Sequence, residues 1–215
     1  MKRLQKAGVL ENIMLIGSWC LYFYKDYFSG LNFTPTIRTR DIDFLVPLPP
    51  KIKNKVDIPE LLKDLGFLLE FVSSKGYIRL DHPELIVGFL VPERGKGSDK
   101  PYPLPQLGLN AQPLRFLDFL VDNLIEIEIG KLKIRLPHPA AFALHKLIIL
   151  GRRTKKEKAD KDKEQALMII DFIVRKEETT KLRSIYSSMP VKWQKKIVAA
   201  LEKLDRKDVV AILQG

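Results

Sequence analysis

The chain has 215 residues, of which 46% are hydrophobic and 29% charged, and it carries a formal net charge of +11. This composition is typical of a folded protein, and the length suits one domain with an appendage or two small domains. The single cysteine, Cys20, excludes an internal disulfide and fits a reducing compartment.

No apolar run approaches the length of a membrane span, and the N-terminal Met-Lys-Arg-Leu-Gln-Lys lacks the apolar block of a signal peptide. We therefore expect a cytoplasmic protein without a membrane partner. The positive charge is uneven, because residues 1–136 carry +3 and residues 137–215 carry +8. A basic C-terminal part attracts nucleic acid or polyphosphate, although a solvated helical surface accounts for the composition equally well.

The N-terminal third begins with a short basic helix over residues 2–10 and an apolar strand over residues 13–16. Ser18 can cap a helix over residues 19–27, which ends at Ser29-Gly30. Gly17 and Ser18 then lie at a strand-to-helix turn, where N–H groups face an anion without side-chain bulk.

Asp41 and Asp43 are separated by one residue in an apolar run that reads as a strand. Residues two apart on a strand point to the same side, so both carboxylates share one space while Ile42 faces the core. Two convergent carboxylates beside a phosphate-binding turn predict a magnesium–nucleotide site. The alternative is an edge strand with a solvated acidic face.

Gly17-Ser18, a helix and then Asp41-x-Asp43 resemble the signature of the nucleotidyltransferase superfamily, which has the DNA polymerase beta-like fold. More narrowly, Arg-Thr-Arg-Asp-Ile-Asp-Phe-Leu-Val resembles a bacterial nucleotidyltransferase-like family related to abortive-infection toxins. The resemblance implies a toxin-like enzyme that moves a nucleoside monophosphate from an NTP to an acceptor hydroxyl. It also implies Mg²⁺ or Mn²⁺ as cofactor, held by the catalytic Asp41 and Asp43, with phosphate bound at Gly17 and Ser18.

The same resemblance implies several kinds of acceptor and partner and does not distinguish between them. The acceptor can be an RNA end such as that of tRNA, a protein hydroxyl or a small molecule, and an antitoxin protein is a further partner. Arg38 and Arg40 directly precede the acidic strand, where they can bind nucleotide phosphates or neutralise the two aspartates when no metal is bound. We favour phosphate or metal-site support for Arg40.

A third carboxylate usually lies on a neighbouring strand in this superfamily, and its expected position here is Gly88, which has no side chain. Glu93 is a possible substitute in the following loop, and Glu126 and Glu128 are further candidates on a later strand. The missing acid supports an alternative function, a nucleotide- or nucleic-acid-binding protein of the same fold with little transferase activity.

The middle of the chain predicts a helix capped by Asp57, three strands, a long loop, a short helix and a hairpin around Gly130. The strands are residues 67–71, 77–80 and 85–91, the loop is 93–105, the helix is 114–120, and the hairpin strands are 125–129 and 131–136. The loop contains Arg94, Lys96 and Lys100, and two interpretations stay open: a lid that covers a phosphate or contacts nucleic acid, and a mobile connection without such a role.

Pro137 marks the expected boundary between an α/β domain, 1–136, and a basic helical domain, 137–215. The predicted helices cover residues 140–150, 163–176, 179–187, 190–204 and 206–213. His138 is interpreted as a loop or cap residue and not as a ligand. By resemblance, Lys146 contacts nucleotide phosphates and Asp171 supports the site. A snorkelling lysine and an exposed or capping aspartate are the alternatives. The predicted fold class is therefore α+β, a mixed-sheet nucleotidyltransferase domain followed by an all-helical domain.

Overall fold

The structure is a computed structural model, and it describes residues 1–36, 39–72, 74–93, 95–97 and 100–215. The chain divides into two compact units, each described by itself below. The first unit contains residues 1–23 and 35–136, and the second contains residues 24–34 and 137–215. Among the described helices, none combines the length and apolar character that a membrane span requires.

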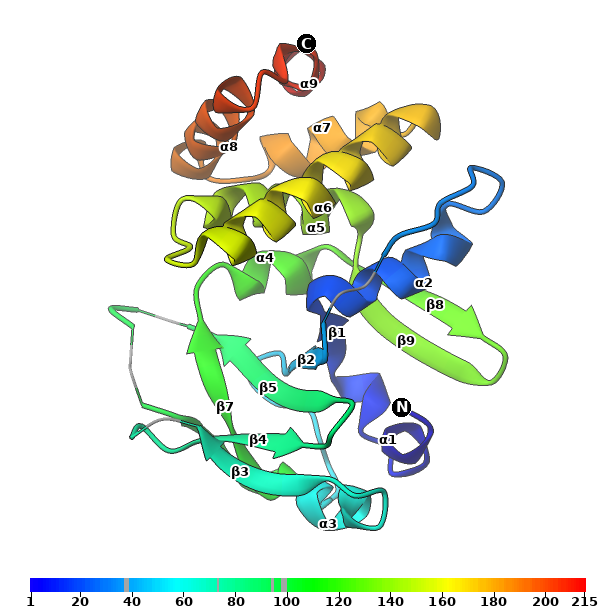
Figure 1. Cartoon of the computed structure of the whole chain (residues 1–215), viewed down its shortest axis with the longest axis vertical. Helices are drawn as coiled ribbons and strands as arrows, with labels where there is room; N and C mark the ends of the chain where they lie inside the picture. Colours follow the sequence, from blue (N-terminus) through cyan, green and yellow to red (C-terminus); the bar gives the residue numbers. More distant parts are fainter. Residues whose placement is uncertain (37–38, 73, 94, 98–99) are drawn as a thin grey trace. The chain divides into compact units, whose positions relative to one another are not determined.

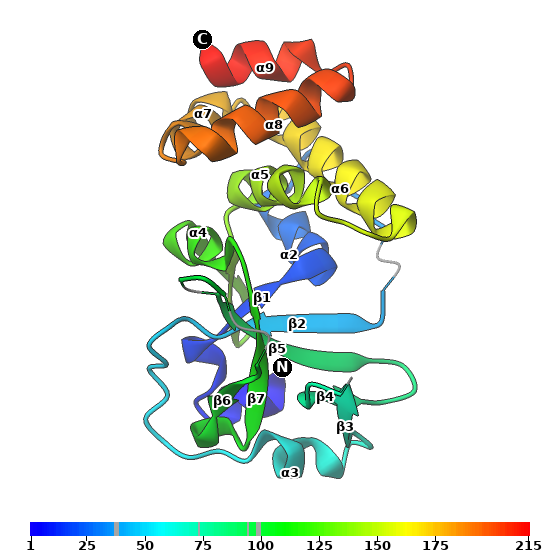
Figure 2. The same cartoon turned by 90° about the vertical axis from the view of Figure 1, so that its left-hand side faces the viewer.

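The first unit is built on a mixed sheet in the order β1-β2-β5-β4-β3, and β7 joins the far end of β5 (Figures 1 and 2). Its strands are β1 (Met14–Ile16), β2 (Asp41–Leu45), β3 (Leu68–Val72), β4 (Tyr77–Asp81), β5 (Ile86–Pro92), β6 (Tyr102–Leu104) and β7 (Leu109–Leu114). β2 pairs antiparallel with β1 and parallel with β5, and β5 pairs antiparallel with β4. The predicted mixed sheet is therefore present.

β2 lies inside the sheet, between β1 and β5, so the edge-strand interpretation of Asp41 and Asp43 is wrong. Its residues alternate as expected, because Ile42 and Phe44 are buried on one face while Asp41 is exposed and Asp43 half-buried on the other. On the buried face, Phe44 stacks on Phe89 of β5 with ring centroids 5.8 Å apart. This packing anchors the strand that carries both carboxylates.

The helices of the first unit are short: α1 (Lys2–Lys6), α3 (Ile58–Lys63) and α4 (Leu117–Asp122), and α2 (Cys20–Tyr27) begins in this unit. Asp57 caps α3 as predicted, because its Oδ1 accepts the Glu60 N–H at 3.0 Å. A two-stranded sheet of β8 (Leu124–Ile129) and β9 (Leu132–Pro137) forms the predicted hairpin around Gly130.

The segment after β5 differs from the sequence prediction in two places. The predicted loop 93–105 ends in a strand, β6, which pairs with β7, and Arg94 of that loop lies outside the described residues. The predicted helix 114–120 begins at Leu117, because Leu114 still belongs to β7 and Arg115 and Phe116 form the turn. Proline-rich sequence obscured both strands, since Pro103 and Pro113 weaken the strand signal without preventing pairing at the sheet periphery.

The second unit is helical, and its helices are α5 (Pro139–Leu150), α6 (Lys156–Arg175), α7 (Thr179–Ser187), α8 (Val191–Lys203) and α9 (Lys207–Gln214), seen in Figure 1. α5 is buried along most of its length, and α6, α7 and α8 contribute apolar faces that include Ile169, Leu182 and Ile197. The charged tract 152–163 is largely the first part of α6, so this helix begins at Lys156, before the predicted start at residue 163.

Residues 24–34 belong to the second unit, although they come early in the sequence. Phe33 packs edge-on against Phe172 of α6 with centroids 4.8 Å apart, and Phe28 lies 5.6 Å from the same ring. The Tyr24 hydroxyl donates to the Pro137 carbonyl at 2.7 Å. These aromatic contacts, which join residues far apart in the sequence, attach the segment to the helical unit.

Candidate active site

The turn after β1 brings backbone close to the acidic strand. Gly17 has φ of +74°, a left-handed conformation that glycine adopts without the strain of a side chain, and it begins a 3₁₀ turn, Gly17–Trp19, that leads into α2. Ser18 in this turn is buried. The predicted strand-to-helix turn is thus present, and Ile16, its last strand residue, pairs directly with Asp43.

The Asp43 carboxylate lies between two glycines. A Cβ atom added to Gly17 would stand 3.1 Å from Asp43 Oδ2, and one added to Gly88 would stand 3.2 Å from Asp43 Oδ1. Asp43 and Gly88 are direct partners in the parallel β2–β5 pairing. A side chain at Gly17 would therefore crowd one oxygen of this carboxylate, and a side chain at Gly88 would crowd the other.

Asp41 lies two residues before Asp43 on the same face, at the exposed start of β2. Its backbone N–H donates to Thr39 Oγ1 at 3.2 Å, and the same hydroxyl donates to Asp41 Oδ2 at 3.3 Å. This local turn orients Asp41 where the strand begins. The structure thus brings Gly17, Asp41 and Asp43 together within the first unit.

The candidates for a third carboxylate all lie elsewhere. Glu93 follows the end of β5 and pairs with Arg115 at 2.6 Å. Glu126 and Glu128 are on β8 of the separate two-stranded sheet, where Arg135 and Lys133 pair with them at 3.9 and 2.8 Å. Within the described ranges, no group of three or more His, Cys, Asp or Glu side chains is arranged to hold a metal ion.

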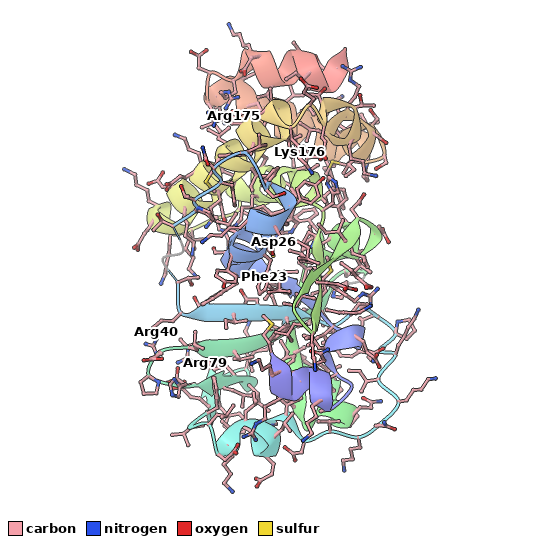
Figure 3. All side chains as sticks on the ribbon, turned by 90° about the vertical axis from the view of Figure 1, so that its right-hand side faces the viewer. Phe23, Asp26, Arg40, Arg79, Arg175 and Lys176 are labelled. Atoms are coloured by element: carbon pink, nitrogen blue, oxygen red, sulfur yellow. The ribbon has the colours of Figure 1, made fainter. Side chains whose placement is uncertain are left out.

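Arg40 turns toward the end of β4. Its Nη2 donates to the His82 carbonyl at 2.7 Å and lies 4.0 Å from Asp81 Oδ1. Arg38, its predicted companion, is outside the described residues. Arg79 of β4 reaches the same Asp81 oxygen at 3.9 Å, and Figure 3 labels both arginines beside this part of the sheet.

Comparison with known protein families shows to which family the chain belongs. A family model described as "Nucleotidyltransferase" matches residues 1–190. The chain belongs to this nucleotidyltransferase family. It is also similar to the crystal structure of an antigenic nucleotidyltransferase-like protein from Paracoccidioides brasiliensis, with 17% identity and a TM-score of 0.48 over 98% of this chain and 88% of that one. Comparison with curated proteins gives no match.

Lys146, which the resemblance assigned to nucleotide phosphates, is buried within the helical unit of this family member. Its Nζ lies 2.5 Å from Asp162 Oδ1, and Arg153 Nε lies 2.5 Å from the other oxygen of the same carboxylate. Burial alone would raise the pKa of Asp162, but the two cations hold it below its usual range. A buried charge needs such a partner, so this ion cluster accounts for Lys146 in the folded unit.

Asp171 lies on α6 and pairs with Arg206, whose Nη2 is 2.7 Å from Asp171 Oδ1. Arg206 also pairs with Asp208 at the start of α9, 2.9 Å away. The Asp171 side chain is 46% exposed. This arrangement corresponds to the exposed aspartate considered as an alternative in the sequence, and it connects α6 to the C-terminal helix.

His138 belongs to a polar cluster that the sequence did not predict, apart from the role of His138 itself as a cap residue. His138 Nδ1 accepts the Ala140 N–H at 3.1 Å, which confirms the cap, so in the neutral ring Nε2 carries the proton toward the Tyr27 hydroxyl 2.9 Å away. Tyr27 in turn donates to Glu178. Burial lowers the pKa of His138 to about 4. No sequence pattern pairs residues 27, 138 and 178, because their contacts depend on the fold of the helical unit.

Proposed function

We propose that this family member is a magnesium- or manganese-dependent enzyme that transfers a nucleoside monophosphate from an NTP to an acceptor hydroxyl. The observation that carries the proposal is the position of the Asp43 carboxylate between Gly17 and Gly88, with Asp41 on the same face of β2. Membership of a nucleotidyltransferase family supports nucleotidyl transfer as the general reaction.

The donor set fits a hard divalent cation. Two carboxylates on one face supply oxygen ligands, and Mg²⁺ is commonly bound by one or two carboxylates together with substrate phosphates. When bound, such an ion neutralises phosphate charge and orients the reacting groups. The absence of side chains at Gly17 and Gly88 leaves space around both oxygens of Asp43.

Gly17 and Ser18 would bind the phosphates. The left-handed glycine begins a turn at the start of α2, where backbone N–H groups precede the helix and no side chain separates the backbone from a ligand. The chain's contribution to the reaction is then mainly positioning, since phosphoryl transfer needs aligned reactants and stabilised charge more than a set of catalytic side chains.

A second candidate function is favoured by Gly88, which stands in register with Asp43 where a third carboxylate is expected from the resemblance. A protein with this arrangement could bind a metal–nucleotide without efficient transfer, because no third carboxylate would act as the base that removes the proton of the acceptor hydroxyl. The two functions share the same binding site and differ only in turnover.

One experiment separates them. Mg²⁺ and each NTP are titrated against the wild type and the Asp41→Ala/Asp43→Ala variant, with binding and pyrophosphate release followed in parallel. We expect metal-dependent binding that the double variant abolishes, together with pyrophosphate release once an acceptor is supplied. Binding without release for RNA, protein and small-molecule acceptors would favour the second function, and an absence of metal-dependent binding would refute both.

The positive charge of the C-terminal part suggests RNA as the acceptor or as a partner. The basic C-terminal part, residues 137–215, carries +8 and would attract RNA such as tRNA, and an antitoxin protein would be a separate partner. RNA affinity is measured at increasing salt concentration. A steep decrease is expected if phosphates are contacted, and a flat response would remove nucleic acid from the proposal.

A further inference from the structure

Arg79 occupies the same row of the sheet as Asp43 and Gly88. Asp43 pairs with Gly88 across β2 and β5, and Gly88 pairs with Arg79 across β5 and β4. Residues directly opposite each other in a sheet project from the same face. With two strand spacings between them, the Cα atoms of Asp43 and Arg79 are about 10 Å apart.

The space above Gly88 is open toward Asp43. Apart from the chain neighbours of Gly88, Asp43 Oδ1 is the one heavy atom of the described residues within 4 Å of the position that a Gly88 Cβ would take. A long side chain from β4 can therefore extend across this row without meeting a side chain at position 88. The row has glycine at the position where a third carboxylate is expected, and it carries the Arg79 guanidinium one strand further on.

The present partners of Arg79 can be exchanged. Its Nε and Nη2 lie 2.7 and 2.5 Å from Glu70 Oε2, and Nη2 lies 3.9 Å from Asp81. The Arg79 side chain is 34% exposed and that of Glu70 is 48% exposed, so this is a solvent-screened pair of the kind that contributes little to stability. Phosphate oxygens match the guanidinium fork in two parallel hydrogen bonds and can compete for it.

We propose that Arg79 binds the phosphate groups of the metal-bound nucleoside triphosphate by extending across Gly88. This inference rests on the proposed function, because it requires a nucleotide held at Asp41 and Asp43. A carboxylate at position 88 would stand between the Arg79 guanidinium and Asp43 and would attract the guanidinium. Glycine at this position leaves the arginine available for an anion. Arg79 is then a binding residue that supplies positive charge in the row where the third acid is missing.

Calorimetric titration of a non-hydrolysable NTP with Mg²⁺ tests this role in the full chain. Arg79→Ala is expected to weaken binding about tenfold or more, as removal of a charged hydrogen-bond donor does. Glu70→Gln removes the negative charge that holds Arg79 and is expected to bind as tightly as the wild type or more tightly. Arg135→Ala is the matched control, because this arginine is 30% exposed and faces Glu126 in the separate sheet, and it should leave binding unchanged.

The outcomes distinguish this inference from the function on which it depends. If Arg79→Ala binds like the wild type while Asp43→Ala does not bind, the role of Arg79 is overturned and the nucleotide site stands. If Arg79→Ala and Glu70→Gln weaken binding equally, the pair only supports the sheet, and the inference is again overturned. If the wild type does not bind, or Asp43→Ala binds normally, the proposed function fails and the role of Arg79 fails with it. Thermal unfolding of each variant verifies folding.

Discussion

Substitution of Gly17 by alanine tests whether the glycine next to Asp43 matters for ligand binding. Gly17 has φ of +74°, and forcing a residue with a Cβ into this left-handed region costs about 1–2 kcal/mol of folding free energy. The new Cβ would also stand 3.1 Å from Asp43 Oδ2, so the carboxylate must move by a few tenths of an ångström. We therefore expect two separate losses, one in stability and one in metal–nucleotide affinity.

Gly76→Ala is the control, because Gly76 has φ of +75° and, its chain neighbours aside, no atom of the described residues lies within 4 Å of its added Cβ. Both variants should lose about 1–2 kcal/mol in urea unfolding, since their backbone strain is the same. Only Gly17→Ala should weaken binding of the Mg²⁺–nucleotide, by about tenfold, because only this substitution displaces a ligand group. Equal affinities for the two variants would refute the assignment of Gly17 and Asp43 to the nucleotide site.

Three further predictions concern the helical unit. Lys146→Met should lower the free energy of unfolding by about 3 kcal/mol, because buried Asp162 loses one of its cations, and adding Asp162→Leu should recover most of this loss. Between pH 6.5 and 4, His138 should remove about 3 kcal/mol of stability, because the unfolded chain binds the proton first as the pH falls. His138→Asn, which keeps a cap acceptor, should remove this part of the pH dependence and leave the part that comes from His145, because burial lowers the pKa of His145 to about 3. Asp171→Asn should leave metal–nucleotide affinity unchanged, because Arg206 already engages this carboxylate.

Each of these predictions has a contradicting result. A Lys146→Met variant that is as stable as the wild type but binds nucleotide weakly would indicate that Lys146 contacts the nucleotide phosphates, as the resemblance implied. If His138→Asn keeps the wild-type slope of unfolding free energy against pH, another group titrates in that range. A loss of nucleotide affinity in Asp171→Asn, with an unchanged unfolding midpoint, would place this residue in support of the site, as the resemblance implied.

Local spacing predicted much of the strand that carries Asp41 and Asp43. Alternation along residues 41–46 placed Asp41 and Asp43 on one face and Ile42 on the other, because the side-chain period of a strand is two residues whatever lies beside it. Gly17 and Ser18 were placed at a turn by the change from a short apolar run to a helical pattern. These features depend on neighbours in the sequence, and the structure retains them.

Non-local pairing explains what local spacing missed. The positions of β6 and β7 depend on pairing with each other and with β5, and prolines within them weakened the local strand signal. Likewise, residues 24–34 join the helical unit through aromatic contacts with Phe172, which lies far along the chain. Spacing within a short window contains no information about such partners.

The sequence by itself therefore determined the two carboxylates and the glycine turn, since each depends on residue type and local period. The missing acid at Gly88 came from the family resemblance. Only the tertiary structure decided what surrounds them. Strand register placed Gly88 directly beside Asp43 and Arg79 one strand beyond, and helix packing paired Lys146 with Asp162. Register and packing depend on burial of whole faces, which no short stretch of sequence specifies.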